Sequence, residues 1–290
     1  MNYVLAVSGG IDSVVLLDMV ARDSHFSKLH FDGASWPEDF IVAHFDHGIR
    51  PESGEDASFV DQLCTDYGVA FVAGSATLGA NASEAVARER RYTFLRSIAK
   101  DGTIVTAHHQ DDVLETIVIN LLRGTGWRGL APMTSAIVRP LLDKTKAEIV
   151  AYAIDHNLTW HDDETNFSAH YFRNRVRDRL LAIVPTDRHR LMRLYTQQKQ
   201  LRNEIETEIT MIGNNVAMFT GRTVSISRYY LIMIPEDVAV ELLHKAVDGR
   251  LTRPQLGRLL LFAKVARPGR RLMFGNVRAS VSQRELAIEL

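Results

Sequence analysis

The amino-acid sequence predicts an α/β fold: a parallel sheet covered by helices on both sides, then a helical linker and a small α+β domain. Strand-like and helix-like segments alternate at least four times along the first part of the chain, as in parallel sheets. A glycine pair separates the first strand from the first helix. After about residue 186 the pattern changes to long polar helices and then to short alternating runs. We therefore predict three segments, at residues 1–186, 187–221 and 222–290.

Short apolar runs bounded by polar residues predict the strands, and apolar residues spaced three or four apart predict the helices. The predicted strands cover residues 3–7, 40–45, 69–72, 103–106 and 136–138. The predicted helices cover residues 14–20, 55–67, 83–99, 111–122 and 146–156, and Asn157 is expected to end the last. In the C-terminal part we expect helices within 186–216, 237–247 and 253–265, and strands within 222–226 and 272–290.

Three polar segments follow predicted strands directly: Ser8–Ser13, His44–Arg50 and His108–Asp112. In open parallel sheets, ligands bind beyond the carboxyl ends of the strands. Core packing does not require polar residues at all three places. We therefore expect the three segments to meet at one edge of the sheet and to form a ligand site there.

Composition excludes several classes of protein. The chain has 290 residues, 46% hydrophobic and 24% charged, which is typical of a globular protein with one large and one small domain. Without an uninterrupted apolar run of 18 residues, no membrane span is expected, and the N-terminus does not resemble a secretion signal, so we expect a cytoplasmic protein. A single cysteine, Cys64, excludes internal disulfides and multi-cysteine sites; we expect it to be buried on a helix.

Charge is spread unevenly along the chain. The formal net charge is −1, but residues 173–202 hold nine Arg or Lys against two acids, and residues 222–290 hold twelve against six. A basic back half indicates a polyanionic partner. The alternative is that these arginines only keep surface helices soluble.

The segment SGGIDS, between the first strand and the first helix, has the chemistry of an anion site. Its glycines let backbone N–H groups approach an anion, and the following helix adds partial positive charge at its N-terminus. Ser8 and Ser13 add hydroxyl donors. Asp12 would repel a phosphate, so its expected role is to hold Mg²⁺ shared with the phosphates. We therefore predict a pyrophosphate and Mg²⁺ on residues Ser8, Gly9, Gly10, Ile11, Asp12 and Ser13.

This arrangement resembles the PP-loop ATP pyrophosphatases, whose Rossmann-like domain (adenine nucleotide alpha-hydrolase-like) cleaves ATP between the α and β phosphates. Further segments resemble one branch, the tRNA(Ile)-lysidine synthetases, in its short form. They are HFDHGIR at 44–50, ARERRY at 87–92, HHQDDVLET at 108–116, RGTGWRGL at 123–130, RPLLDKTKAEI at 139–149, DETN at 163–166 and FRNRVR at 172–177. The resemblance is looser over 222–290.

The resemblance implies an enzyme, a ligase. Those enzymes adenylate O2 of the wobble cytidine (C34) of tRNA(Ile) with anticodon CAU, and lysine then displaces AMP at C2. The products are lysidine, AMP and diphosphate; the tRNA then reads AUA instead of AUG and is charged with Ile instead of Met. By resemblance, residues 1–186 form the ATP-binding catalytic domain and 222–290 a tRNA-binding domain. The expected cofactors and partners are ATP, Mg²⁺, L-lysine and the tRNA, and some short forms are dimers.

Two carboxylates are the expected centre of the chemistry. Asp112 and Glu115 are three residues apart, so they share one face of a helix and can point at the same place. They can bind a cationic amine, and one can accept its proton; which one stays open. The alternative is that the acids only cap the helix N-terminus. We assign catalytic roles to Asp112 and Glu115, with Asp12 and Arg177.

Other residues are expected to contact the nucleotide, the tRNA or lysine, and each has a structural alternative. His44 and His108 are assigned to the nucleotide, although one histidine of the pair His108–His109 could simply be packed. Arg88 and Arg91 can reach RNA phosphates or a flipped base, or form a solvated face paired with Glu84 and Glu89.

A second basic cluster, Arg173, Asn174 and Arg177, could clamp a phosphate or the AMP intermediate, because acids are scarce nearby in the sequence. Lys146 could contact tRNA or lysine, or be a plain surface lysine. Trp127 could stack on a base or pack in the interior.

Three other functions are weighed. A tRNA 2-thiolation enzyme hands sulfur over through paired cysteines or a cluster, which one cysteine cannot supply. NAD and GMP synthetases act on small molecules and do not need the basic back half. A silent RNA-binding module would tolerate loss of Asp12, Asp112 or Glu115, yet all three are present.

Overall fold

The computed structural model of the chain describes residues 3–48, 53–77, 79, 83–133, 136–161 and 172–290. The chain divides into two compact units, residues 1–199 and 200–290.

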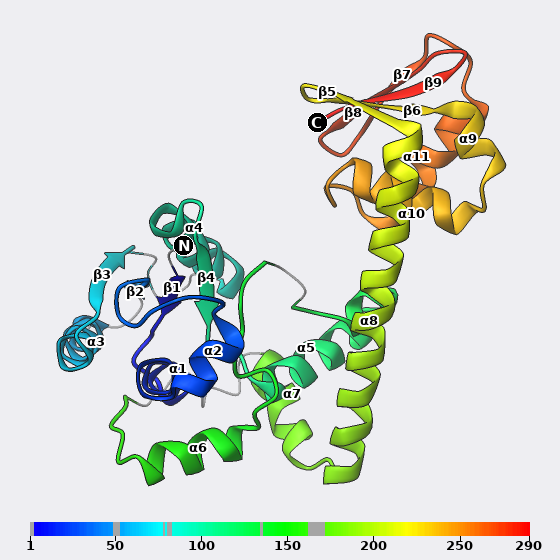
Figure 1. Ribbon diagram of the computed structural model, residues 1–290. Helices are drawn as coiled ribbons and strands as arrows, with labels where there is room; N and C mark the ends of the chain where they lie inside the picture. Colours follow the sequence, from blue (N-terminus) through cyan, green and yellow to red (C-terminus); the bar gives the residue numbers. More distant parts are fainter. Residues whose placement is uncertain (1–2, 49–52, 78, 80–82, 134–135, 162–171) are drawn as a thin grey trace. The chain divides into compact units, whose positions relative to one another are not determined.

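The first unit is built on a parallel sheet of four strands in the order β3-β2-β1-β4 (Figure 1). The strands are β1 (Tyr3–Ala6), β2 (Phe40–Asp46), β3 (Ala70–Ser75) and β4 (Thr103–Thr106). These confirm four of the predicted strands. The predicted strand at 136–138 is wrong, because only Val138 pairs, in a single parallel bridge with Val105. Pro140 follows two residues later and has no N–H to continue a ladder.

The helices up to residue 216 connect the strands, cover the sheet or follow it, and the last of them continues into the second unit. They are α1 (Ile11–Arg22), α2 (Ser24–His30), α3 (Ser53–Tyr67), α4 (Glu84–Ala99), α5 (Gln110–Leu122), α6 (Lys146–Asp155), α7 (Phe172–Leu181) and α8 (Pro185–Val216), with a short 3₁₀ turn, η1 (Trp127–Leu130). Asn157 follows α6 with φ of +52°, consistent with the predicted helix stop. Helix α2 was not predicted. It is short and begins because the Asp23 carboxylate accepts from the N–H groups of His25 and Phe26.

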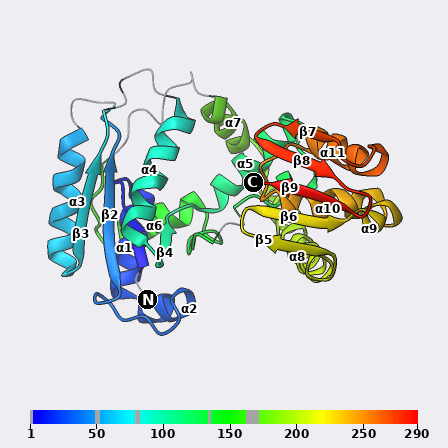
Figure 2. The ribbon, with the colours of Figure 1, turned by 90° about the horizontal axis from the view of Figure 1, so that it is seen from above.

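Alternate residues of β1 face opposite sides of the sheet, as the period of two requires. Leu5 and Val7 are buried in a core shared with α1, α3 and α6. Val4 is buried in a smaller core, on which the buried side of α4 packs. In Figure 2 the sheet accordingly runs between α3 on one side and α4 on the other. The helices hold β1 and its following loop from both faces.

A buried carboxylate ties together the helices of the larger core. Asp18 on α1 is fully buried and accepts hydrogen bonds from the hydroxyls of Tyr67 (2.5 Å) and Tyr152 (2.9 Å), and Arg22 pairs with it at 2.9 Å. Burial and the bond to Asp18 raise the pKa of Tyr67 to about 12. Because Tyr67 ends α3 and Tyr152 lies on α6, this group fixes α1, the helix that follows the glycine pair.

The second unit has its own antiparallel sheet in the order β5-β6-β9-β8-β7. Its elements are β5 (Ala217–Thr220), β6 (Thr223–Ser227), α9 (Arg228–Met233), α10 (Glu236–Ala246), α11 (Arg253–Val265), β7 (Arg271–Phe274), β8 (Val277–Val281) and β9 (Glu285–Glu289). The core lies between the sheet and α10 and α11. The predicted helical linker, 187–221, ends in strand β5, because Met218 and its neighbours pair with β6.

Two further features agree with the sequence. Cys64 is buried on α3, and burial raises the pKa of its thiol to about 12. Among the helices of the described residues, none is both long and apolar enough to cross a membrane.

Candidate active site at the carboxyl edge of the parallel sheet

The loop after β1 has the backbone geometry of an anion cradle. Gly9 has a φ of +93°, which residues with a Cβ rarely adopt. Ser13 Oγ donates to the Gly10 carbonyl oxygen (2.8 Å) and accepts from the Ser8 N–H (3.2 Å), which closes the loop. Gly10 caps α1 without a side-chain hydrogen bond to the first turn. This backbone geometry is compatible with the predicted phosphate site, which stays a prediction.

Asp12 and Lys146 meet beside this loop. Asp12 lies in the first turn of α1, and Lys146 begins α6; Lys146 Nζ lies 2.5 Å from Asp12 Oδ1. Both side chains are partly exposed, at 32% and 43%. The Lys146 ammonium therefore lies beside the Ser8–Ser13 loop, and its contact with tRNA or lysine stays a prediction.

The N-terminus of α5 lies against the same pair. His109 caps the helix, and Asp112 completes a capping box by accepting from the His109 N–H at 3.0 Å. His109 Nε2 lies 3.8 Å from Asp12 and 3.6 Å from Asp112. Asp111 accepts from the backbone N–H of Lys146 (2.8 Å) and pairs with Arg188 of α8. One oxygen of Asp112, Oδ2, thus caps the helix, as the alternative interpretation expected. The other oxygen, Oδ1, accepts from Arg173 of α7.

Glu115 is held from two sides by arginines of α7. Its side chain is 2% exposed; Oε2 accepts from Arg173 Nε at 2.8 Å and Oε1 from Arg177 Nε at 2.6 Å. Arg173 also donates to Asp112 Oδ1 at 3.1 Å. Few acidic residues lie near these arginines in the sequence. In the structure, the carboxylates that pair with them come from α5.

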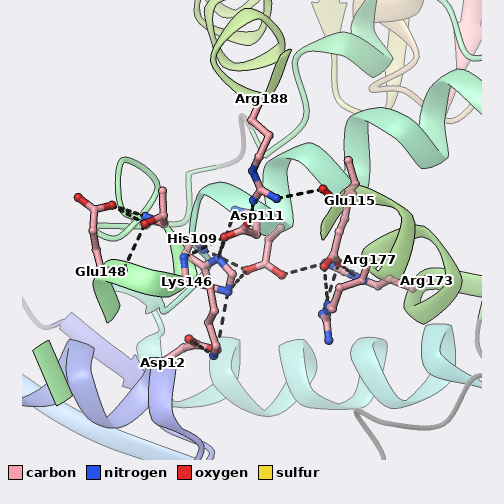
Figure 3. A network of polar contacts seen from close by, with 12 residues as sticks. Asp12, His109, Asp111, Glu115, Lys146, Glu148, Arg173, Arg177 and Arg188 are labelled. Atoms are coloured by element: carbon pink, nitrogen blue, oxygen red, sulfur yellow. Dashed lines mark hydrogen bonds and ion pairs between the residues drawn. The ribbon is translucent and has the colours of Figure 1, made fainter. Parts of the chain in front are cut away.

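Figure 3 shows that these contacts form one polar network from Asp12 through His109 and the start of α5 to Glu115 and α7. Carboxylates and cationic side chains alternate along its contacts among the described residues. The members are Asp12, Asp111, Asp112, Glu115, Lys146, Arg173, Arg177 and Arg188, with His109 among them.

Charge states in the network follow from burial and from its charge pairs. Burial alone would raise the pKa of Asp112, but His109, His108 and Arg173 outweigh it, so the pKa is lowered and the carboxylate stays ionised. Burial opposes the charge of Arg177, but the hydrogen bond and charge of Glu115 raise its pKa above the ordinary value.

His108 directly precedes the residue that caps α5. Its Nδ1 shares a hydrogen bond with Thr106 Oγ1 at 2.8 Å. Burial lowers the pKa of His108 to about 3, so the ring is neutral at physiological pH. A neutral imidazole here can hydrogen-bond a base but cannot compensate a phosphate charge.

The remaining predicted residues lie around the network. His44 is buried at the end of β2 and donates from Nδ1 to the Val7 carbonyl (3.0 Å), so this nitrogen holds β1 and β2 together. Arg88 donates to the Tyr92 hydroxyl (3.4 Å) and lies over the Tyr92 ring, as Arg91 does. The Trp127 ring is covered by Arg128, 4.6 Å from its centre.

Several predicted residues fall outside what the structure describes. These are Arg50, the DETN segment 163–166, and the side chains of Glu84 and Asn174. Their assigned roles stay predictions.

Sequence reasoning missed Asp111, Arg188 and the pair His161–Asp56. Asp111 lies in the HHQDDVLET segment, but the prediction assigned a role to its neighbour Asp112 and none to Asp111. Arg188 was counted only as part of the basic stretch. The pair His161–Asp56, at 2.7 Å, joins residues 105 apart in sequence and had no motif to signal it.

The chemistry of Asp12 fits Mg²⁺, which prefers carboxylate and phosphate oxygens. Asp12 is partly exposed beside the phosphate loop, where a cation could be shared with phosphates. Within the described residues no group of three or more His, Cys, Asp or Glu side chains could hold a metal ion alone.

Comparison with known proteins identifies relatives of this chain. The chain is 33% identical over 254 residues to a tRNA(Ile)-lysidine synthase of Thermotoga maritima, an alignment covering 82% of this chain and 58% of that protein. It is 36% identical over 192 residues to a tRNA(Ile)-lysidine synthase of Actinobacillus pleuropneumoniae, covering 63% of this chain and 43% of that protein. The chain thus spans between two and three fifths of the length of these relatives.

Among solved structures, a U34-tRNA thiolase of Methanococcus maripaludis with its [4Fe-4S] cluster matches with a TM-score of 0.53. The match covers 69% of this chain and 73% of that one at 19% identity, so it supports the fold alone. The family model described as the PP-loop domain matches residues 1–184. Because this match covers more than half of the chain and includes the SGGIDS loop and the α5 carboxylates, the chain belongs to the PP-loop domain family.

Proposed function

We propose that the protein is an ATP-dependent ligase that joins lysine to C2 of the wobble cytidine of tRNA(Ile) with anticodon CAU. The reaction forms lysidine and releases AMP and diphosphate. One observation carries the proposal: the phosphate loop and the carboxylates of α5 belong to a single network. The names of the relatives supply the substrate class.

In the first step, O2 of the cytosine attacks the α phosphorus of ATP. The new O–P bond forms as the bond to diphosphate breaks, so the base carries AMP on O2. The N–H groups at the start of α1 and the Lys146 ammonium would bind the phosphate oxygens. When bound, Mg²⁺ held by Asp12 would neutralise part of the phosphate charge. Lys146 and Asp12 are both partly exposed beside the loop, so each can turn toward the nucleotide.

In the second step, an amino group of lysine attacks C2, the C2–O2 bond breaks, and AMP leaves with that oxygen. The amine arrives as an ammonium and must lose its protons. Asp112 is the carboxylate we assign to the ammonium, because it is ionised and its side chain is 15% exposed. Glu115 is nearly fully buried, and both its oxygens already accept from arginines.

Glu115 therefore has a positioning role in our proposal. By holding Arg173 and Arg177, it fixes the side of α7 that faces α5. Arg173 also touches Asp112, so lysine binding at Asp112 would loosen one arginine contact. A released guanidinium beside the site is well suited to the phosphate of the adenylate.

The polyanionic partner fits the second unit. Its exposed arginines on α11 and in the following segment are a surface for RNA phosphates. The homodimer and the cytoplasmic location expected from the sequence stay predictions.

A sulfur-transfer reaction is disfavoured by the cysteine. Thiolation requires an accessible thiolate, but Cys64 is 1% exposed and burial raises its thiol pKa to about 12. As the only cysteine of the chain, it can neither relay sulfur to a second thiol nor hold a cluster by cysteines.

The test gives the purified protein ATP, Mg²⁺, labelled lysine and a tRNA(Ile) transcript with anticodon CAU. Label should enter this tRNA, and AMP and diphosphate should appear in equal amounts. Initiator tRNA(Met), which shares the anticodon, should stay unlabelled. ATP cleavage without transfer of lysine would contradict the proposed acceptor chemistry.

The carboxylate assignment needs a matched pair of variants. Asp112→Asn keeps an oxygen for the His109 N–H and should lower lysine transfer at least about 100-fold, the usual scale for removing a group that binds and deprotonates the nucleophile. Asp155→Asn changes an exposed acid at the end of α6 and should transfer lysine at the wild-type rate. Equal rates for the two variants would remove Asp112 from the mechanism.

A further inference from the structure

His161 lies directly against the glycines of the phosphate loop. Its backbone N–H donates to the Gly9 carbonyl oxygen at 3.0 Å. A Cβ on Gly10 would lie 3.9 Å from the His161 carbonyl oxygen. His161 lies in the segment that follows α6. The backbone contact fixes where its side chain starts.

One face of α3 orients the imidazole. The ring stacks on Phe59 with centroids 4.3 Å apart and planes at 19°, and Nδ1 lies 2.7 Å from Asp56 Oδ1. Asp56 and Phe59 are three residues apart on α3, so they face the same way. Phe59 also packs on the loop, 3.5 Å from where a Cβ of Gly9 would be.

The Asp56 contact decides which ring nitrogen is available. A carboxylate only accepts, so Nδ1 carries the hydrogen and donates to Asp56. Nε2 has no hydrogen-bond partner among the described residues, and the His161 side chain is 42% exposed. When the ring is an imidazolium, Nε2 is a charged donor whose partner must be an anion or water.

Of the cations in the network, the proposed function assigns only Lys146 to the phosphates of ATP. The other cations are paired with carboxylates of α5. A triphosphate brings several negative charges to the Gly9–Gly10 loop. His161 contacts Phe59 and Asp56 of α3 and none of the cations or carboxylates of the network in Figure 3, so it is an additional donor at the loop.

We propose that His161, oriented by Asp56, binds the pyrophosphate portion of ATP through Nε2. This deepens the proposed function and rests on it, because it takes ATP as the nucleotide. The group that His161 would bind is the pair of linked phosphates that leaves as diphosphate, and not the nucleoside or the α phosphate.

The experiment measures the affinities of ATP, inorganic pyrophosphate and AMP by calorimetry on the full chain with Mg²⁺. His161→Gln removes the imidazole but keeps a polar side chain, and His161→Phe keeps a ring to stack on Phe59 but removes both nitrogens. Both variants should weaken ATP and pyrophosphate binding about 10- to 150-fold, the scale of one hydrogen bond to a charged group, and leave AMP binding unchanged. Asp56→Asn should weaken pyrophosphate binding less, about 2- to 5-fold, because it only loosens the ring.

His156→Gln is the matched control. His156 is also stacked on an aromatic ring, Tyr152, at 3.8 Å and 13°, and its Nδ1 also has an oxygen partner, the Tyr152 carbonyl. Its nucleotide affinities should equal those of the wild type. Thermal melting of each variant shows whether the fold is intact.

Two results would overturn the inference. Unchanged pyrophosphate affinity in either folded His161 variant would show that the residue only pins its segment to α3. Equal weakening of AMP and pyrophosphate would show a general distortion of the loop. If the wild type itself binds neither ATP nor pyrophosphate, the proposed function fails as well, so the two failures are distinguishable.

Discussion

Replacing Glu115 by glutamine should unfold the first unit more easily, because a buried charge holds two arginines there. The Glu115 side chain is 2% exposed and accepts from Arg173 at 2.8 Å and Arg177 at 2.6 Å. A hydrogen bond to a charged group contributes about 1.5–3 kcal/mol, and removing one partner of a buried ion pair costs about 3–5 kcal/mol. The arginines are 24% and 38% exposed and can turn toward water, so we expect the lower end, about 3 kcal/mol.

This free energy converts into a shift that melting curves resolve. For a folding unit of roughly 200 residues, 1 kcal/mol corresponds to about 2–4 °C in Tm. Glu115→Gln should therefore melt about 6–12 °C below the wild type, followed by circular dichroism and by urea unfolding.

An exposed ion pair of the same unit provides the control. Asp187 and Arg190 lie 2.9 Å apart on α8, with side chains 49% and 75% exposed. Asp187→Asn should lower the free energy of unfolding by less than about 1 kcal/mol, as is usual at the surface.

A double-mutant cycle separates the contact from general damage. Glu115→Gln and Arg177→Gln should be non-additive by about 1–3 kcal/mol, because each removes the same interaction. Our reasoning is refuted if Glu115→Gln melts within about 1 °C of the wild type, or if the two substitutions are additive.

Three further outcomes are expected. First, burial lowers the pKa of His108 to about 3 in the folded chain, so below about pH 6.5 the unfolded chain binds a proton there that the folded chain does not. The free energy of unfolding should therefore fall as the pH drops from about 6.5 toward 3. The fall should be steeper than in His108→Gln by up to about 1.4 kcal/mol per pH unit. An identical pH slope in the variant would contradict this. Second, Tyr67→Phe removes a hydroxyl that donates to the buried Asp18 and should lower the free energy of unfolding by about 1–3 kcal/mol in urea, whereas Tyr229→Phe, on an exposed ring of the second unit, should leave it unchanged. Third, charge reversal of exposed arginines in the second unit should weaken tRNA binding and reduce its salt dependence in filter-binding assays, without changing ATP affinity, and unchanged tRNA affinity would show that this surface is only solvated. The residues to reverse are Arg253, Arg258, Arg267, Arg270 and Arg271.

Local patterns in the sequence were sufficient for the parallel sheet and the phosphate loop. Each strand of the sheet is a short apolar run, and its partners follow from the alternation with helices. The loop was predictable because its function requires glycines directly between a strand and a helix. The strand expected at 136–138 failed because one bridge, between Val105 and Val138, looks the same in sequence as a ladder.

The network could be predicted only in part. Asp12, Asp112 and Glu115 were identified from motifs, but their partners depend on how distant segments pack. Arg177 lies 62 residues from Glu115, and Lys146 lies 134 from Asp12. Such pairs have no periodicity, so the sequence shows charged residues without showing which ones neutralise each other.

Burial was the second property that the sequence did not reveal. Asp112 and Glu115 are equivalent in the motif, yet one side chain is 15% exposed and the other 2%. This difference is set by α7, which covers Glu115. It separates a partly exposed carboxylate from a buried one that holds two arginines.

The most direct measurement follows the α phosphate of labelled ATP while lysine is withheld from the enzyme and tRNA(Ile) with anticodon CAU. We expect label to accumulate on the tRNA as the adenylate and to leave as AMP within one turnover once lysine is added. A tRNA that never carries label while lysine is incorporated, or nucleotide released as ADP, would contradict the assignment of the SGGIDS loop and the α5 carboxylates to one two-step reaction.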